Sequence, residues 1–213
     1  KMTILDKINA NKLIEIEVAK AKVSVEDLES SVLFDRKCIS LRDAILNKSG
    51  IIAEFKRQSP SKGVINGVSK PEDVAIAYEK AGVSAMSCLT DLNYFGGTFA
   101  DLKAVRAAVE MPVLRKDFML DEYQLLEAKS IGADIVLLIA SSLSVAKTNE
   151  MAKAAKALGL NVLLEIHEDS ELAHINQYCD AVGVNNRNLK TFEVTTDVSK
   201  ALANKIPNDF IKV

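Results

Sequence analysis

The sequence lacks several features that would mark it as a particular class of protein. Its 213 residues include no tryptophan, 5% aromatic residues and three cysteines. Cys38, Cys88 and Cys179 are far apart and lack metal-type spacing, so we expect buried thiols in a reducing compartment. No apolar run approaches the ~20 residues of a membrane-spanning helix, and no apolar signal segment opens the chain. We therefore expect a cytoplasmic protein with no membrane partner.

Neither sign of charge dominates. Lysine and arginine total 27 and aspartate and glutamate total 29, which gives a net charge of −2 at pH 7. Nucleic-acid binding relies on clustered positive charge, so we expect no nucleic-acid partner. The chain does contain 48% apolar residues, a share typical of a globular protein with a core.

Helical spacing of apolar residues characterises the first fifty residues. The apolar set of the first predicted helix is Ile4, Leu5, Ile8, Leu13, Ile16 and Val18. The lysines and glutamates among them predict a solvated face. A second helix is predicted over Ser40–Lys48, with Gly50 as its C-terminal stop.

After Gly50, short apolar runs alternate with amphipathic stretches. The predicted strands are Ile51–Phe55, Ala85–Leu89, Pro112–Leu114, Ile135–Ile139, Val162–Leu164, Ala181–Val184 and Phe210–Val213. Among the six helices that we expect after them are Pro71–Ala81, Phe99–Val109, Glu122–Ile131 and Val145–Leu158. Strands that are apolar on both faces indicate a parallel sheet covered by helices, and the alternation indicates βα units.

This pattern predicts an α/β fold, a (β/α)8 TIM barrel with an extra N-terminal helical segment. An open doubly wound sheet is the competing architecture, but no Gly-x-Gly-x-x-Gly motif follows the first strand. We interpret residues 1–213 as one barrel domain, with 1–50 as the helical extension and 51–213 carrying strands one to seven. Because the sequence stops within the predicted seventh strand, we expect the C-terminal units to be absent from it.

In a parallel barrel the reacting groups lie at the carboxyl ends of the strands. Glu54 and Lys56 alternate onto one face of the first strand, as an acid and a base at the barrel mouth or as a plain ion pair at a solvated strand end. Lys116 shares a face with Phe118 and is a candidate general acid if that face is the interior. The alternative, Arg115 inward and Lys116 outward, stays open.

Further polar residues follow the other strands. Ser59 belongs to a donor-rich loop that suits an anionic ligand or forms only a turn. Glu165 is the third ionisable candidate for the interior, whereas we interpret His167 as an ordinary loop histidine. Asn185 and Arg187 share one parity, and an amide beside a guanidinium can hold hydroxyls and carboxylates or phosphates.

Taken together, these groups predict one site at the barrel mouth, with an apolar lining of Phe95, Phe118 and Leu189. That combination favours acid/base chemistry on an anionic, partly apolar substrate. No His/Cys/Asp cluster has metal-ligand spacing and no Ser-His-Asp set is evident, so we expect no metal.

The same residues lie in stretches that resemble indole-3-glycerol phosphate synthases. Residues 52–63 read IAEFKRQSPSKG, 114–118 read LRKDF and 183–189 read GVNNRNL. The match continues, in order, through 3–8, 89–91, 94–97, 132–134 and 164–165. The resemblance implies a (β/α)8 barrel of tryptophan biosynthesis that closes the indole ring of 1-(2-carboxyphenylamino)-1-deoxyribulose 5-phosphate, releasing carbon dioxide and water. It also implies a phosphorylated small-molecule substrate, no cofactor, and possible fusion or association with other enzymes of the pathway.

By the same resemblance, Lys116 is the general acid of ring closure and Glu165 serves in the dehydration. Glu54 and Lys56 form a coupled pair, and Asn185 orients a substrate hydroxyl.

Substrate contacts also follow from the resemblance. Ser59 and Arg187 approach the benzoate carboxylate, and Phe95, Phe118 and Leu189 enclose the anthranilate ring. The family's phosphate-binding loops follow strands seven and eight and are not in this sequence.

Two other functions compete with this one. A different sugar-phosphate barrel, such as an isomerase of the same pathway, would act without releasing carbon dioxide. An inactive, C-terminally truncated barrel fragment would only bind a ligand or a partner.

Overall fold

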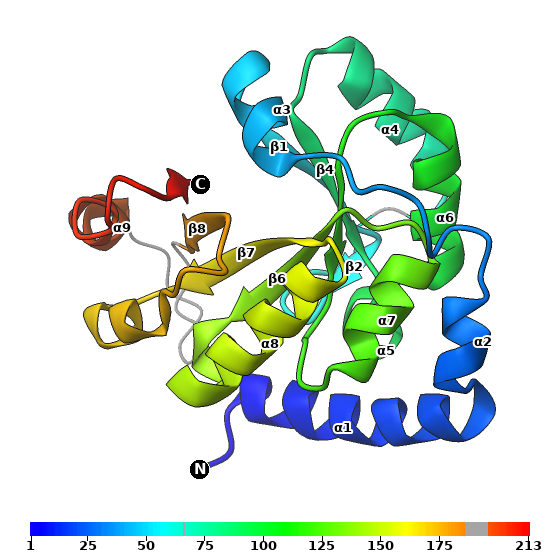
Figure 1. Cartoon of the computed structure of the whole chain (residues 1–213), viewed down its shortest axis with the longest axis horizontal. Helices are drawn as coiled ribbons and strands as arrows, with labels where there is room; N and C mark the ends of the chain where they lie inside the picture. Colours follow the sequence, from blue (N-terminus) through cyan, green and yellow to red (C-terminus); the bar gives the residue numbers. More distant parts are fainter. Residues whose placement is uncertain (66, 186–195) are drawn as a thin grey trace.

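The computed structural model describes residues 1–65, 67–185 and 196–213, and a curved parallel sheet forms its centre (Figure 1). Within these residues the sheet has seven strands in the order β1-β4-β5-β6-β7-β8-β9. Their bounds are β1 Ile52–Phe55, β4 Ala85–Leu89, β5 Val113–Lys116, β6 Ile135–Ile139, β7 Asn161–Ile166, β8 Ala181–Val184 and β9 Ile211–Lys212. Every neighbouring pair is parallel, so successive βα units build the sheet and the predicted TIM-like α/β fold is confirmed.

Helices cover the outer face of this sheet (Figure 1). Those that connect successive strands are α4 Pro71–Lys80, α6 Phe99–Ala108, α7 Tyr123–Ser130, α8 Val145–Ala157 and α9 Thr196–Ala203. The ranges predicted for α4, α6, α7 and α8 are confirmed to within one residue at either end. Between β7 and β8, however, the chain forms the 3-10 helix η2 (Asp169–His174). A separate short 3-10 turn, η1 (Ala140–Ser142), follows β6. Of the six helices expected after the strands, five are α-helices in the described part of the chain, and the connection between β7 and β8 holds the 3-10 helix η2 instead.

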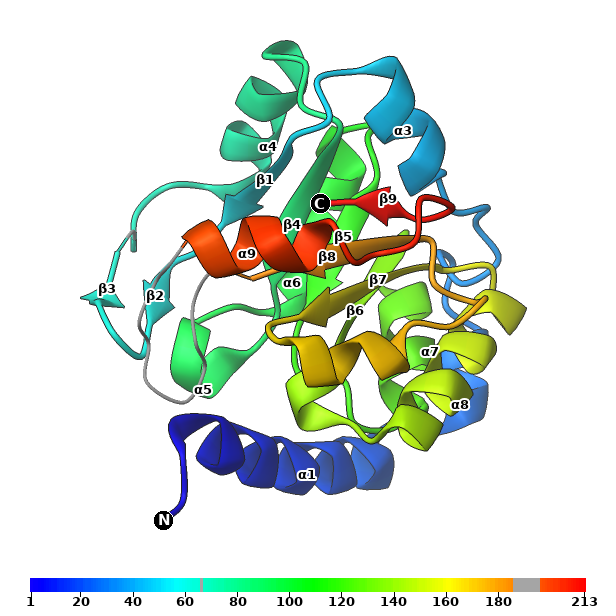
Figure 2. The same cartoon turned by 90° about the vertical axis from the view of Figure 1, so that its left-hand side faces the viewer.

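The N-terminal segment forms α1 (Ile4–Lys22), α2 (Val25–Glu29) and α3 (Leu41–Asn47). Figure 2 shows α1 running across one end of the molecule, past the ends of the strands. A capping box between Thr3 and Asp6 begins this helix. No helix in the described parts of the chain is long and apolar enough to cross a membrane.

The faces of α1 differ in part from the prediction. Leu5, Ile8 and Ile16 are buried as expected, but Leu13 and Val18 are exposed. Lys12, which the sequence placed on a solvated face, is only 3% exposed. The helix lies against a polar part of the barrel, so its buried stripe contains a charge.

Two apolar clusters cover the two faces of the sheet. One lies between strands and outer helices and includes Met86, Leu102 and Leu138. The other fills the inside of the curved sheet and includes Leu114, Leu137 and Leu163, together with Leu5 and Ile8 of α1. Side chains alternate along each strand, and both faces are covered, which is why these strands are apolar throughout.

Two small elements at the carboxyl ends of the strands were not predicted. The polar loop after β1 contains the antiparallel ribbon β2 (Gln58–Ser59) with β3 (Gly63–Val64), and the one-turn helix α5 (Leu92–Phe95) follows β4. A glycine with a positive φ, Gly96 at +68°, ends α5. Both elements carry residues that the sequence assigned to the site.

Candidate functional site

A cavity of about 260 Å³ opens at the carboxyl ends of the strands, where parallel barrels carry their reacting groups. Eight of the ten predicted site residues line it: Glu54, Lys56, Ser59, Phe95, Lys116, Phe118, Glu165 and Asn185. The other two, Arg187 and Leu189, lie outside the described residues. These eight residues lie at the ends of β1, β5, β7 and β8, on β2 and on α5, and residues up to 131 positions apart in the numbering thus meet in one cavity.

The closest charged pair in the cavity joins β1 and β5, the strands on either side of β4. Nζ of Lys116 lies 2.6 Å from Oε2 of Glu54. Lys116 shares its face with Leu114, which belongs to the inner cluster, so it is Lys116 that points into the barrel. Arg115 points the other way and is buried beneath the outer helices, which resolves the alternative that the sequence left open.

Glu54 has two further partners. Nζ of Lys56 lies 3.9 Å from Oε1 of Glu54, and the hydroxyl of Ser87 donates a hydrogen bond of 3.1 Å to Oε2. Ser87 was not predicted, yet it is the register partner of Glu54 on β4 and is 3% exposed. A polar residue inside an otherwise apolar strand is the sequence signal that could have revealed it. This carboxylate is therefore held from three sides.

Glu165 reaches the cavity from the end of β7, with 16% of its side chain exposed. His167 lies beside it, with Nε2 3.6 Å from Oε2 of Glu165. We expected His167 to be an ordinary loop histidine; it is not among the residues that line the cavity, but its ring lies beside Glu165. Asn185 lines the same cavity from the end of β8.

Apolar side chains also line the cavity. The rings of Phe95 and Phe118 lie 5.9 Å apart at 31° to each other. Ile4, Leu5 and Ile8 of α1 line the same cavity and were not predicted as site residues. Their apolar spacing in the sequence indicated a buried helix face, but nothing in it indicated what that face covers.

Ser59 lies at the polar rim. It is 6% exposed, and its hydroxyl accepts a hydrogen bond of 3.2 Å from the main-chain N–H of Lys62. This contact closes the turn between β2 and β3, so Ser59 has a structural role as well as a position facing the cavity.

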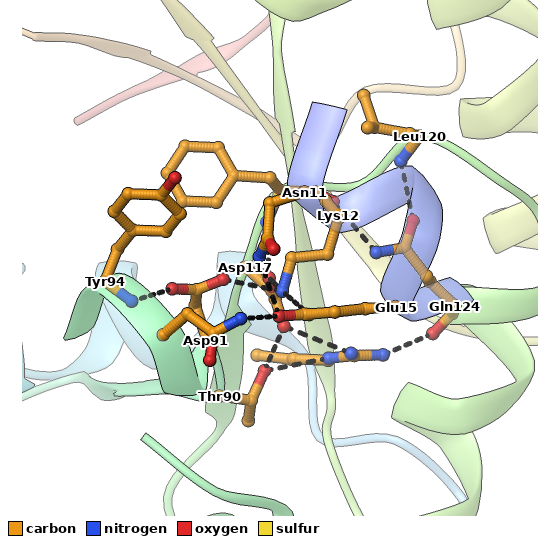
Figure 3. Close-up of polar contacts among 12 residues, drawn as sticks. Asn11, Lys12, Glu15, Thr90, Asp91, Tyr94, Asp117, Leu120 and Gln124 are labelled. Carbon is orange, nitrogen blue, oxygen red and sulfur yellow. Dashed lines mark hydrogen bonds and ion pairs between the residues drawn. The ribbon is translucent and has the colours of Figure 1, made fainter. Parts of the chain in front are cut away.

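A buried cluster of charges fixes α1 against the strands behind the cavity (Figure 3). Nζ of Lys12 lies 2.6 Å from Oδ1 of Asp91, 2.9 Å from Oδ1 of Asp117 and 2.6 Å from Oε2 of Glu15. Burial by itself would lower the pKa of Lys12, but the carboxylates of Asp117 and Asp91 outweigh it and raise that pKa. The lysine is therefore charged, and it binds α1 to the strand end that carries Lys116.

Arg115 extends the cluster toward the outer helices. Its guanidinium donates to Thr90 at 3.0 Å, to Asp117 at 3.2 Å and to Glu127 at 3.3 Å. Burial raises the pKa of Asp117, but Arg115 and Lys12 together bring it below its usual range. Both neighbours of Lys116 in the chain are thus locked, which fixes the strand end that presents it.

The donor set of the site suits proton transfer. Among the described residues, no group of three or more histidine, cysteine, aspartate or glutamate side chains could hold a metal ion. Two lysines, two glutamates and an amide face an apolar slot with two aromatic rings. Such an arrangement can deliver and accept protons at separate points of a ligand that has both an aromatic and a polar part.

The sequence is similar to those of known proteins. The sequence model of a family described as "Indole-3-glycerol phosphate synthase" matches residues 5–213. An indole-3-glycerol phosphate synthase of Bacteroides thetaiotaomicron is 46% identical over 211 residues, which cover 99% of this chain and 81% of that protein.

Two solved structures are similar in fold. A tryptophan synthase α2β2 complex from Pyrococcus furiosus gives a TM-score of 0.52 at 16% identity and covers 78% of this chain and 79% of that one. The YdjI aldolase from Escherichia coli K12 gives 0.51 at 18% identity and covers 78% and 67%. At these identities the likeness concerns the fold alone.

Proposed function

The chain belongs to the indole-3-glycerol phosphate synthase family, and from that premise we propose which of its side chains carry out the reaction. The family consists of carboxy-lyases of tryptophan biosynthesis, so the substrate is a phosphorylated small molecule. The reaction closes the indole ring of 1-(2-carboxyphenylamino)-1-deoxyribulose 5-phosphate with loss of carbon dioxide and water. The family match supports this activity over that of an inactive fragment.

We assign ring closure to Lys116. As the ring carbon attacks the ribulose carbonyl, the ammonium gives a proton to the carbonyl oxygen, and carbon dioxide then leaves from the ring. The observation that carries the proposal is the 2.6 Å contact of Lys116 with Glu54 at the cavity wall. This contact holds the ammonium of Lys116 at the cavity wall, and a general acid has to be held within hydrogen-bond reach of the atom that it protonates.

We assign the dehydration to Glu165, which acts as the base or donates a proton to the leaving hydroxyl. Asn185 orients a substrate hydroxyl, and Lys56 acts with Glu54 as a coupled pair. Loss of a carboxylate and loss of water need protons at two places. The cavity offers ionisable groups from β1 and β5 and a further one from β7.

Substrate binding uses both kinds of surface. Phe95, Phe118 and Leu189 enclose the anthranilate ring, while Ser59 and Arg187 hold its carboxylate. A rigid slot of this kind brings the ring carbon and the carbonyl of a flexible chain together, which is an orientation effect. We further propose that the enzyme works in the cytoplasm and that it associates or is fused with other enzymes of the pathway.

The test is turnover of the anilino-ribulose phosphate, followed by indole fluorescence and by release of carbon dioxide in parallel. Both signals should rise together in a one-to-one ratio. Consumption of the substrate with neither indole fluorescence nor carbon dioxide would instead identify an isomerase. Ligand binding with neither signal would identify a barrel that binds without reacting. A useful control is the Lys103→Ala variant, because this lysine is exposed on α6, away from the cavity.

A further inference from the structure

The outward face of α1 carries apolar side chains that the reaction described above does not use. In Figures 1 and 2 this helix lies at the edge of the molecule, with the described part of the chain on its inner side. Leu5 and Ile8 on the inner side are buried, whereas Leu13, Ile14 and Val18 are 53%, 66% and 48% exposed. A surface helix usually presents charged side chains to water, so apolar side chains on both faces indicate a second contact.

The outermost residues of α1 follow the spacing of a helix-pairing seam. Lys7, Ala10, Ile14, Glu17 and Ala21 recur at intervals of three and four positions, and all five are exposed. We call these five residues the outer seam. Their spacing keeps them on one stripe of the helix, like the a and d positions of a coiled coil. Alanine at two of the five positions allows a partner helix to approach closely.

The charges of the outer seam complement a reversed copy of the same seam. Lys7 precedes Ala10 by three positions, and Glu17 follows Ile14 by three positions. In an antiparallel pair, each Ile14 therefore lies against the small Ala10 of the other copy, and each Lys7 faces a Glu17. A parallel pair would instead place lysine opposite lysine and glutamate opposite glutamate, so the charges select the antiparallel orientation.

We propose that α1 is a docking surface for a second copy of this chain, with the two outer seams antiparallel about a two-fold axis between Ala10 and Ile14. Each copy contributes the same surface, so the contact closes as a dimer. The antiparallel order also brings the positive end of each helix macrodipole beside the negative end of the other. Leu5 and Ile8 line the cavity from the inner side of the helix, so the pairing does not depend on the function proposed for the cavity.

One helix from each copy makes a small interface. The 19 residues of α1 span about 28 Å, and one stripe of that length buries less than the roughly 1,600 Å² of a standard interface. We therefore expect a weak dimer with a dissociation constant on the order of 100 µM. At about 1 µM the protein is then almost entirely monomeric, so urea unfolding at that concentration should be nearly unchanged by substitutions in the outer seam and checks that each variant is folded.

Sedimentation equilibrium over a range of about 5 to 500 µM tests the dimer. The average mass should rise with concentration from that of the monomer toward that of the dimer. Ile14→Lys should keep the protein monomeric over the whole range, because it places two like charges beside the axis. Val32→Lys is the matched control, since this apolar side chain is 97% exposed but lies outside α1, and it should dimerise like the unsubstituted protein. A monomer at every concentration would overturn the proposal, as would a dimer that Ile14→Lys leaves unchanged.

An exchange of charges tests the orientation of the pair. Lys7→Glu places glutamate opposite Glu17 at two points of the interface, and Glu17→Lys places lysine opposite Lys7, so each should raise the dissociation constant at least about tenfold. The variant with both substitutions again has opposite charges across the axis and should return to within about threefold of the unsubstituted protein. Lys103→Glu, at an exposed position of α6, controls for the change in net charge. Losses that add in the double variant would overturn the antiparallel seam, whether or not the cavity is active.

Discussion

Nζ of Lys12 in the N-terminal helix lies 2.9 Å from Oδ1 of Asp117, the residue that follows Lys116 in the chain. Both side chains are buried, at 3% and 2% exposure. A helix outside the barrel is thus tied by a charge to the strand end that presents the proposed general acid. The same helix covers the cavity with Ile4, Leu5 and Ile8.

This ion pair leads to a prediction about stability. Lys12→Met should lower the free energy of unfolding by about 3–5 kcal/mol, because the carboxylates of Asp91 and Asp117 would be left buried without a cation. KM should also rise, since α1 lines the cavity. Urea unfolding and steady-state kinetics measure the two effects. Lys7→Ala, at an exposed position of the same helix, should change stability by less than about 0.5 kcal/mol. A similar small loss in both variants would contradict the prediction.

The proposed general acid is tested by Lys116→Ala. We expect kcat to fall by at least ~10²-fold, the scale of general acid catalysis, with the fold unchanged because the side chain is 35% exposed. Indole fluorescence under saturating substrate measures the rate, and circular dichroism checks the fold. Near-normal turnover would remove Lys116 from this role.

Ser87 supports the partner of that lysine. In Ser87→Ala the carboxylate of Glu54 loses one of its hydrogen bonds, worth about 1 kcal/mol, so kcat should fall about fivefold. Ser84→Ala is the matched control, because Ser84 is equally buried, accepts from the N–H of Gly50, and precedes the same strand at its far end. That variant should lose stability and keep its kcat. Equal kcat values in the two variants would argue against a role of Ser87 in the site.

A substitution at Gly97 tests whether the position of Phe95 matters for substrate binding. A Cβ at this position would lie 2.0 Å from the main-chain oxygen of Leu89, so the segment that carries Phe95 must move. Gly97→Ala should cost about 1–3 kcal/mol and raise KM. Gly159→Ala, where φ is +83° and the space is open, should cost about 1 kcal/mol and leave KM unchanged. An unchanged KM in Gly97→Ala would show that Phe95 does not contact the substrate.

The low pKa of Glu171 predicts a pH dependence of stability. Burial by itself would raise this pKa, but hydrogen bonds with His167 and Ser141 lower it to about 2, below its ordinary value of 4.5. A depressed pKa stabilises the folded state above pH 4.5, and this stabilisation is lost as the pH falls toward 2. Relative to Glu171→Gln, the contribution should reach about 3 kcal/mol near pH 6 and shrink steadily below pH 4.5. Urea unfolding of both proteins from pH 3 to 7 measures it, and the exposed Glu168→Gln should show no such trend.

Much of the fold could be predicted because local patterns determine it. The strands β4 and β6 have the bounds that their apolar runs predicted, since both faces of a covered parallel strand are buried. The 3-10 helix η2 and the ribbon β2–β3 could not be predicted in this way. Side-chain to main-chain hydrogen bonds build such short elements, and no periodicity reports them.

By itself the sequence determined which residues share a face, and the order of polar residues at the strand ends. Glu54 with Lys56, and Lys116 with Phe118, follow from the period of two along a strand. Only the tertiary structure decided that these faces are the inside of the barrel, because the same alternation would suit either side. It also buried Lys12 and turned His167 toward Glu165. Each of these side chains contacts charged groups, and those contacts depend on how the elements pack in space. No local sequence pattern reports that packing.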